Sequence, residues 1–190
     1  KQSLGKRAKR LSGRVESGKV AFEGDESLGR QFIEALRAQD EEDWATHHFH
    51  TYPARFSPLG AKILLASLEG KRFADPFCGG GTLLLEAMLA DREVFGSDLN
   101  PVAVMVSNAR MQILKPQELD EFLDLVDLVA NEAKDYVESN QKLWLPQPIL
   151  KIKSWYKANM FNELAALYTA HSAYHNEYSI LLKAVFSSIV

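Results

Sequence analysis

Cysteine, long apolar runs and paired prolines are scarce or missing in this sequence. Its 190 residues contain a single cysteine, Cys78, which excludes a disulfide framework and a cysteine-based metal cluster. No apolar run approaches the roughly 20 residues that span a bilayer, and the basic, polar start has no apolar core of a signal peptide. We therefore expect a soluble, cytoplasmic protein with no membrane partner.

Charge is unevenly placed, although the net charge is only −3. Residues 1–20 carry seven basic side chains against Glu16 alone, and residues 116–140 carry eight acidic side chains against Lys134. A basic arm can bind nucleic-acid phosphates and release counterions even when the domain behind it is acidic. The competing interpretation is a solvated tail, and the sequence leaves both open.

Hydrophobic periodicity predicts an α/β chain in three parts. They are a basic arm over residues 1–26, an α/β core over residues 27–115 and a helical region over residues 116–190. The elements that we predict are, in chain order, helices over 27–39 and 57–70, a strand over 72–77, a helix over 82–90, a strand over 93–99, a helix from 101 that Pro116 terminates, a long helix over 117–139, and two helices hinged near His175 and Asn176.

Three helix starts carry capping residues. Ser27 and Ser57 are predicted N-caps, Pro58 follows Ser57 in the first turn, and Asn100 is the predicted N-cap of the helix that starts at Pro101. The strand-helix-strand segment between them predicts a pair of parallel strands. In the helical region we expect the aromatic and leucine positions to lie in the core.

The segment "FADPFCGGGT" is the most informative stretch of the chain. Three glycines after a strand permit positive φ and let a ligand approach the backbone, and the helix that follows offers free N–H groups. A Walker loop would need lysine before the hydroxyl of Thr82, and a dinucleotide fingerprint would need glycine where Leu84 stands. The loop therefore lacks the Walker lysine and fits the dinucleotide fingerprint poorly.

Two acidic residues at successive strand ends define the ligand further. Asp75 would repel a phosphate but would favour a cationic ligand, and S-adenosylmethionine (AdoMet) carries an ammonium and a sulfonium group without a phosphate. Asp98 lies 23 residues beyond Asp75, where an acid can accept both ribose hydroxyls, and Leu99 can pack on an adenine. One adenosyl ligand with a cationic tail fits both acids.

Three segments then carry a family resemblance. "DPFCGGGTLLLEA" and "GSDLNPVAV" resemble the AdoMet-binding motifs of class I methyltransferases, particularly DNA amino-methyltransferases, and "HTYPARFSP" is similar to a segment that precedes the glycine loop in some of those enzymes. The resemblance implies a partial Rossmann-like sheet with a helical C-terminal extension. It also implies AdoMet as cofactor and DNA as partner.

The cofactor-binding residues that we predict follow from these motifs. For Tyr52 and Phe56 the alternative is plain core packing, and Cys78 has no catalytic role because it lies inside the cofactor loop. The predicted residues are Tyr52, Phe56, Asp75, Phe77, Cys78, Gly79, Gly81, Thr82, Asp98 and Leu99.

The chemical half of such an enzyme is missing from the sequence. Amino-methyltransferases of this family use a (D/N/S)-P-P-(Y/F) loop that holds the flipped-out base, and no Pro-Pro pair exists in the chain. We expect the catalytic loop after Val190, or on a second chain, so that this fragment alone is inactive. The function implied is methylation of adenine N6 or cytosine N4 in DNA, of the restriction-modification type.

Two alternatives remain at this stage. The substrate can be RNA, such as guanine in transfer RNA, or the chain can be a non-catalytic AdoMet-binding or specificity subunit.

His47, His48 and His50 also form a cluster, but without a fourth ligand at a recognisable spacing we expect a solvated loop and no metal site.

Overall fold

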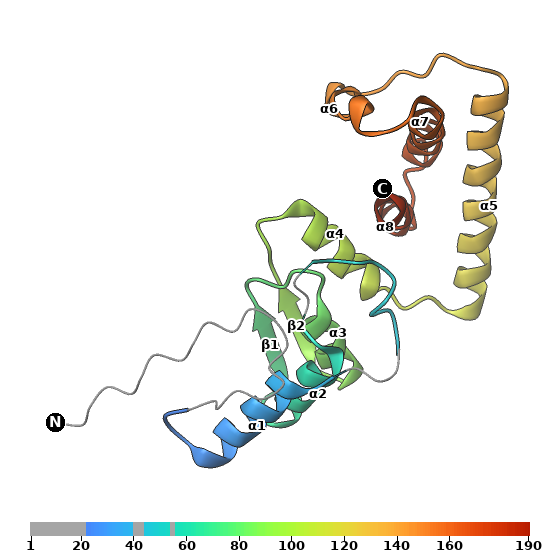
Figure 1. Cartoon of the computed structure of the whole chain (residues 1–190). Helices are drawn as coiled ribbons and strands as arrows, with labels where there is room; N and C mark the ends of the chain where they lie inside the picture. Colours follow the sequence, from blue (N-terminus) through green and yellow to red (C-terminus); the bar gives the residue numbers. More distant parts are fainter. Residues whose placement is uncertain (1–21, 40–43, 54–55) are drawn as a thin grey trace. The chain divides into compact units, whose positions relative to one another are not determined.

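The computed structural model describes residues 22–39, 44–53 and 56–190, and most of the predicted basic arm therefore lies outside the described residues. The described elements alternate helices and strands in the first part and are helical in the second (Figure 1). In chain order they are α1 Glu26–Arg37, α2 Pro58–Ala66, β1 Arg72–Asp75, α3 Thr82–Leu89, β2 Glu93–Gly96, α4 Pro101–Arg110, α5 Pro116–Glu138, α6 Gln147–Lys151, the 3₁₀ helix η1 Lys153–Trp155, α7 Ala158–Ser172 and α8 Ser179–Ile189.

The described residues fall into two compact units. The first unit runs to His48 and resumes at Tyr52–Met111, and the second combines Phe49–Thr51 with Gln112–Val190. The two units are described separately below, and the glycine loop, Gly79–Gly81, belongs to the first.

The first unit is built on a parallel strand pair, as the strand-helix-strand pattern predicts. β1 pairs with β2 so that Phe73 lies opposite Val94 and Asp75 opposite Gly96. Helix α3 packs on both strands and also contacts α2 and α4. On this face a Cβ at Gly96 would collide with the Leu84 side chain, so glycine lets α3 lie close to the sheet.

The opposite face of the strand pair is open in the part of the chain that the structure describes. Ala74 is exposed there, and Phe95 keeps 68% of its side-chain surface exposed. Parallel sheets in proteins are normally covered on both faces, so this exposure is unusual for parallel strands.

Both strands are shorter than the sequence pattern predicts. β1 ends at Asp75 and β2 at Gly96, and the chain turns at Pro76 and Phe77 instead of continuing as a strand. The turn forms because Asp75 Oδ1 accepts a hydrogen bond from the Phe77 N–H at 3.0 Å.

Helix starts confirm two of the predicted caps and correct the third. Ser57 accepts from Gly60 N and Asn100 from Val102 N, each at 3.0 Å. The first helix, however, begins at Glu26, because Asp25 Oδ1 accepts from Leu28 N at 2.8 Å. Ser27 is therefore inside α1 and not its N-cap.

Helix α4 also differs from its prediction. It ends at Arg110, and residues 111–115 form a non-helical connection before Pro116 starts α5. Proline at the first helical position is favourable, because its missing N–H would have no partner within the helix.

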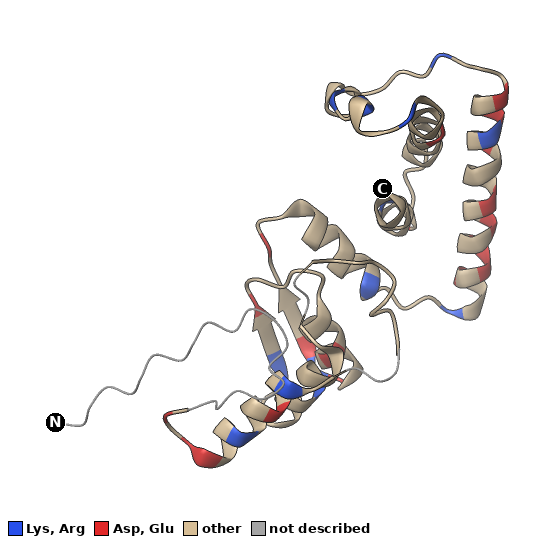
Figure 2. Cartoon of the chain, in the orientation of Figure 1, with Lys and Arg blue, Asp and Glu red and all other residues tan. Residues whose placement is uncertain are grey.

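The second unit is helical, and its two C-terminal helices are hinged as predicted. α5 packs against α7, and α7 packs against α8 (Figure 1). Phe122, Val129 and Ala133 of α5 are buried, whereas Leu119 and Leu123 remain about half exposed, so the apolar stripe of this helix is only partly covered. Acidic residues follow the length of α5 (Figure 2). None of the described helices is both long and apolar enough to cross a membrane.

Candidate functional site

The glycine loop connects the end of β1 to the start of α3. Gly79 and Gly81 adopt positive φ values of 50° and 78°, which side chains other than glycine rarely adopt. Gly80 is constrained differently, because a Cβ there would lie 2.9 Å from Arg110 Nη1 and 3.0 Å from Tyr52 Cβ. All three positions therefore require glycine, two for conformation and one for packing.

Asp98 holds the loop from the neighbouring strand end. Its Oδ2 accepts a hydrogen bond from Gly79 N at 2.9 Å, and its Oδ1 accepts from Asn100 N at 2.8 Å. The N–H groups of Asn100 and Gly79 lower the pKa of Asp98, so the carboxylate is ionised at neutral pH. Each carboxylate oxygen has a second acceptor position, which leaves capacity for ligand hydroxyls.

Tyr52 lies over the glycine loop. Its ring is 3.4 Å from the place where a Cβ on Gly79 would stand, and its hydroxyl accepts a hydrogen bond from Asn100 Nδ2 at 3.1 Å. Tyr52, Gly79 and Asp98 thus come together although they are far apart in sequence. Phe56 lies near Gly60 of α2, where a Cβ would be 3.4 Å from the Phe56 ring.

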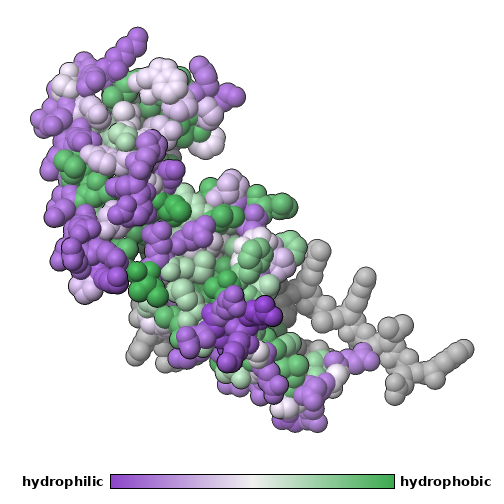
Figure 3. Space-filling model, turned by 180° about the vertical axis from the view of Figure 1, so that it is seen from behind, coloured by the Kyte–Doolittle hydropathy of each residue, from purple (hydrophilic) through white to green (hydrophobic). Residues whose placement is uncertain are grey.

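Two predicted residues stand out into solvent beside this loop. Phe77 is 81% exposed and Leu99 is 96% exposed, so neither packs against the protein. Hydrophobic side chains are widely present on the surface seen in Figure 3. An aromatic and a leucine beside a polar loop offer apolar surface to a planar base.

The start of α3 lies beneath the loop. Thr82 is the first residue of α3 and is buried, and Cys78 is also buried, with its sulfur 3.9 Å from Ser107 Oγ. Burial raises the pKa of the Cys78 thiol, and the charges of Asp75 and Asp98 raise it further. The thiol is therefore neutral at physiological pH, and a neutral thiol is a poor nucleophile.

Buried charged residues beside the loop were not foreseen from the sequence. Glu86 of α3 is 4% exposed and accepts a hydrogen bond from Trp44 Nε1 at 2.6 Å, and the same Oε1 lies 2.7 Å from His47 Nε2. Arg110, 1% exposed, donates to the Gly80 carbonyl. The signal available in the sequence was a single charged residue in each of two otherwise apolar helices, Glu86 in α3 and Arg110 in α4. A charge that is buried with such a helix needs a specific partner.

The expectation of a solvated histidine loop is wrong for two of its three members. His47 is 1% exposed because it pairs with Glu86, and His50 is 8% exposed with Nε2 at 3.1 Å from Ser187 Oγ within the second unit. His48 is exposed as expected. The described residues contain no group of three or more metal-ligating side chains placed to hold an ion.

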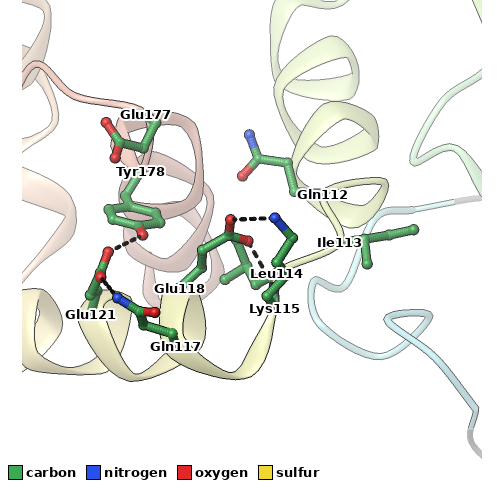
Figure 4. A pocket seen from close by; sticks show the side chains of 9 residues that line it. All are labelled: Gln112, Ile113, Leu114, Lys115, Gln117, Glu118, Glu121, Glu177 and Tyr178. Carbon is green, nitrogen blue, oxygen red and sulfur yellow. Dashed lines mark hydrogen bonds and ion pairs between the residues drawn. The ribbon is translucent and has the colours of Figure 1, made fainter.

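A separate hollow of about 530 Å³ lies at the start of α5 in the second unit (Figure 4). Tyr178 donates to Glu121 there, while Lys115 and Glu118 close the first turn of α5 (Figure 4). Burial and the Glu121 hydrogen bond raise the pKa of Tyr178 to about 12. No motif residue lines this hollow, so we place the candidate cofactor site at the glycine loop.

Comparison with known proteins agrees with the chemistry of this loop. Residues 63–143, which include the glycine loop and Asp98, match the family model described as "RMKL-like, methyltransferase domain". The chain is also 31% identical over 140 residues to the Type II methyltransferase M.MvaI of Kocuria varians. Together the two similarities support an enzyme of the methyltransferase type.

The similarity to this relative covers unequal shares of the two proteins. The matched segment comprises 70% of this chain but only 30% of the relative. No solved structure is detectably similar to the chain.

Proposed function

We propose that the chain is the cofactor-binding part of an AdoMet-dependent DNA methyltransferase that acts on adenine N6 or cytosine N4 in a restriction-modification system. The observation that carries the proposal is the hydrogen bond between Asp98 and Gly79, which joins the acidic strand end to the glycine loop. A methyltransferase requires a methyl donor, and AdoMet is the donor whose charges suit Asp75 and Asp98.

The geometry supports specific roles for the site residues. The spare acceptor positions of Asp98 would take the ribose hydroxyls, while Asp75 would attract the cationic methionine end. Leu99 would contact the adenine, Phe77 would line the methionine and ribose end, and Tyr52 would cover the loop. In this proposal the protein binds and orients the donor, and the methyl group passes from the sulfonium directly to an amino nitrogen.

The catalytic loop would come from polypeptide outside these 190 residues, either after Val190 or on a second chain. Two observations support this view: the sequence has no Pro-Pro pair, and the matched segment is 30% of the relative. The open face of β1 and β2 also needs a cover of the kind that further strands and helices of a Rossmann-like sheet provide.

Titration with AdoMet tests the cofactor proposal. We expect saturable binding in isothermal calorimetry, and weaker or no binding of ATP, because its phosphates would meet Asp75. Loss of AdoMet binding by a chain with native circular dichroism would overturn the proposal.

Variants of Asp98 make this test specific. Asp98→Ala should weaken AdoMet binding about tenfold or more, because both the ribose contacts and the Gly79 hydrogen bond are lost. Asp98→Asn retains an acceptor for Gly79 N and should lose less. Glu69→Ala, at an exposed position in the connection between α2 and β1, is the control and should bind as the wild type does. Equal affinity of all three variants would remove Asp98 from the site.

The substrate is tested with the longer protein. Incorporation of labelled methyl groups into duplex DNA is the expected result for a polypeptide extended past Val190. Incorporation into transfer RNA alone would replace DNA as the substrate, and transfer by the 190 residues alone would contradict a separate catalytic part.

A further inference from the structure

Arg110 is the most deeply buried cationic side chain beside the glycine loop. It is the last residue of α4 and only 1% of its surface is exposed. A buried guanidinium is costly unless its N–H groups find acceptors. The groups that accept hydrogen bonds from the guanidinium therefore indicate which parts of the protein Arg110 holds together.

The guanidinium holds two separate parts of the first unit. Nη1 donates to the carbonyl oxygen of Gly80 at 2.7 Å, and Nη2 donates to the carbonyl oxygen of His47 at 3.0 Å. Gly80 is the middle residue of the glycine loop, and His47 lies in the turn Trp44–His48. One planar side chain thus connects two backbone segments that lie 33 residues apart in sequence.

The Trp44–His48 turn has further anchors around the same point. Thr46 Oγ1 donates to the carbonyl oxygen of Arg110 at 2.8 Å, and Trp44 and His47 both contact Glu86 of α3. Because the turn is fixed to α3 and α4, the Gly80 carbonyl is tied to a rigid frame through the Arg110 side chain.

Ligand approach to the loop depends on this contact. With its carbonyl turned toward Arg110, Gly80 cannot rotate its peptide planes without breaking a charge-assisted hydrogen bond. Gly79 on one side is held by Asp98, and Gly81 on the other packs on Ser107, where a Cβ would lie 2.7 Å from the Ser107 Cβ. Arg110 therefore completes a set of three contacts, one for each glycine.

We propose that Arg110 is a positioning residue that keeps the glycine loop in its ligand-binding conformation by joining the Gly80 carbonyl to the Trp44–His48 turn. In this proposal Arg110 acts through the Gly80 carbonyl and needs no contact with a ligand. The part of the inference that concerns AdoMet rests on the proposed function, but the effect on the loop does not.

Cys78 provides a readout that needs no ligand. It is the only cysteine, it is 8% exposed, and it directly precedes Gly79, so its alkylation requires local opening of the loop. The rate of iodoacetamide modification is measured by mass spectrometry under native conditions for Arg110→Met and Arg110→Lys. Arg110→Lys retains the charge but lacks the planar fork that reaches two carbonyls.

Arg92 supplies the matched control in the same unit. It donates to the Leu68 carbonyl at 3.1 Å, and its guanidinium lies 4.6 Å from the centre of the Phe73 ring. Arg92→Met and Arg92→Lys remove a comparable arginine contact away from the glycine loop. Circular dichroism and thermal unfolding of all variants report the overall fold.

We expect both Arg110 variants to raise the Cys78 modification rate by roughly 5- to 150-fold, with Arg110→Lys the smaller effect, and both Arg92 variants to leave it near the wild-type value. If Arg110→Met does not fold, Arg110→Lys decides. Wild-type rates in the folded Arg110 variants, or equal acceleration by the Arg92 variants, would overturn the proposal.

AdoMet titration of the same proteins separates the two proposals. Where the wild type binds AdoMet, Arg110→Lys should weaken binding by about fivefold or more while Arg92→Lys does not. Unchanged AdoMet affinity of Arg110→Lys would also count against a positioning role. A wild type that fails to bind AdoMet contradicts the proposed function, and the Cys78 rates then decide the role of Arg110 alone.

Discussion

His171 is a buried base that finds no hydrogen-bond partner among the described residues. It is 7% exposed, and neither Nδ1 nor Nε2 has a partner there. It lines an apolar hollow of about 180 Å³ in the second unit and contacts the rings of Tyr168 and Phe186. Burial lowers the pKa of His171 below 6.5, and the charge of Lys183 adds to the effect.

The sign of the resulting pH dependence follows from this pKa. Below pH 6.5 the unfolded chain protonates His171 while the native protein does not, so stability is lost as the pH falls toward the folded-state pKa. His171→Leu should raise the free energy of unfolding by roughly 1 kcal/mol at pH 8, because an unpaired buried polar group is removed. The gain should increase below pH 6.5.

Urea denaturation between pH 5 and pH 8 measures this difference. His175→Gln, at an exposed position, is the control and should keep the pH dependence of the wild type. A constant difference between His171→Leu and the wild type across this range would show that His171 does not cause the effect.

At the level of single residues, the sequence singled out the glycines and Asp98, which the structure joins by a hydrogen bond, but it missed the residues that support them. The glycines and Asp98 were identifiable because their spacing is tied to a ligand. Arg110 and Glu86 were missed because their partners are a backbone carbonyl and a distant turn, and neither contact leaves a periodic pattern. His47 was misjudged for the same reason.

At the level of elements, the start of α1 offers a direct test of capping. Asp25→Ala should reduce the free energy of unfolding by about 1 kcal/mol, because Leu28 N loses its side-chain acceptor. Ser27→Ala should have little effect or stabilise slightly, since alanine is the better helix former inside α1. Thermal unfolding of the two variants compares them.

If Ser27→Ala destabilised the protein more than Asp25→Ala, Ser27 would be the N-cap. The correction itself shows why the sequence did not decide the matter. Both Asp25 and Ser27 are good capping residues, and the choice depends on which side chain reaches a free N–H. The end of β1 was ambiguous for a similar reason. The hydrogen bond from the Phe77 N–H to Asp75 Oδ1 forms a local turn that competes with continuation of the strand.

At the level of the whole molecule, apolar surface stands exposed where a methyltransferase-type sheet would be covered. Phe95 and Ala74 on the open face of β1 and β2 are exposed, Phe95 to 68%. We expect the 190-residue chain to bind the dye ANS strongly, because such surfaces seldom remain free in a folded monomer.

A polypeptide extended past Val190 to the length of the relative should bind less ANS per molecule, because added strands and helices would cover this surface. ANS fluorescence at equal concentrations, with cooperative thermal unfolding as the check on folding, makes the comparison. Equal fluorescence would argue that this face remains open in the longer protein. The parallel pairing of β1 and β2 was predictable from the sequence, whereas the extent of their cover was not, because the local strand pattern does not show which distant segments pack on each face.

The turn that carries His47 also contains a backbone strain that can be relieved. Ala45 adopts φ of 51°, a left-handed conformation that costs a residue with a Cβ about 1–2 kcal/mol. Ala45→Gly should therefore stabilise the protein by roughly 0.5–1 kcal/mol after the added unfolded-state entropy is counted. Asn140→Gly, at φ of 49°, should change stability less, because asparagine tolerates this region. Thermal unfolding distinguishes the two, and a gain at residue 45 alone would make this turn a starting point for engineering a more robust protein.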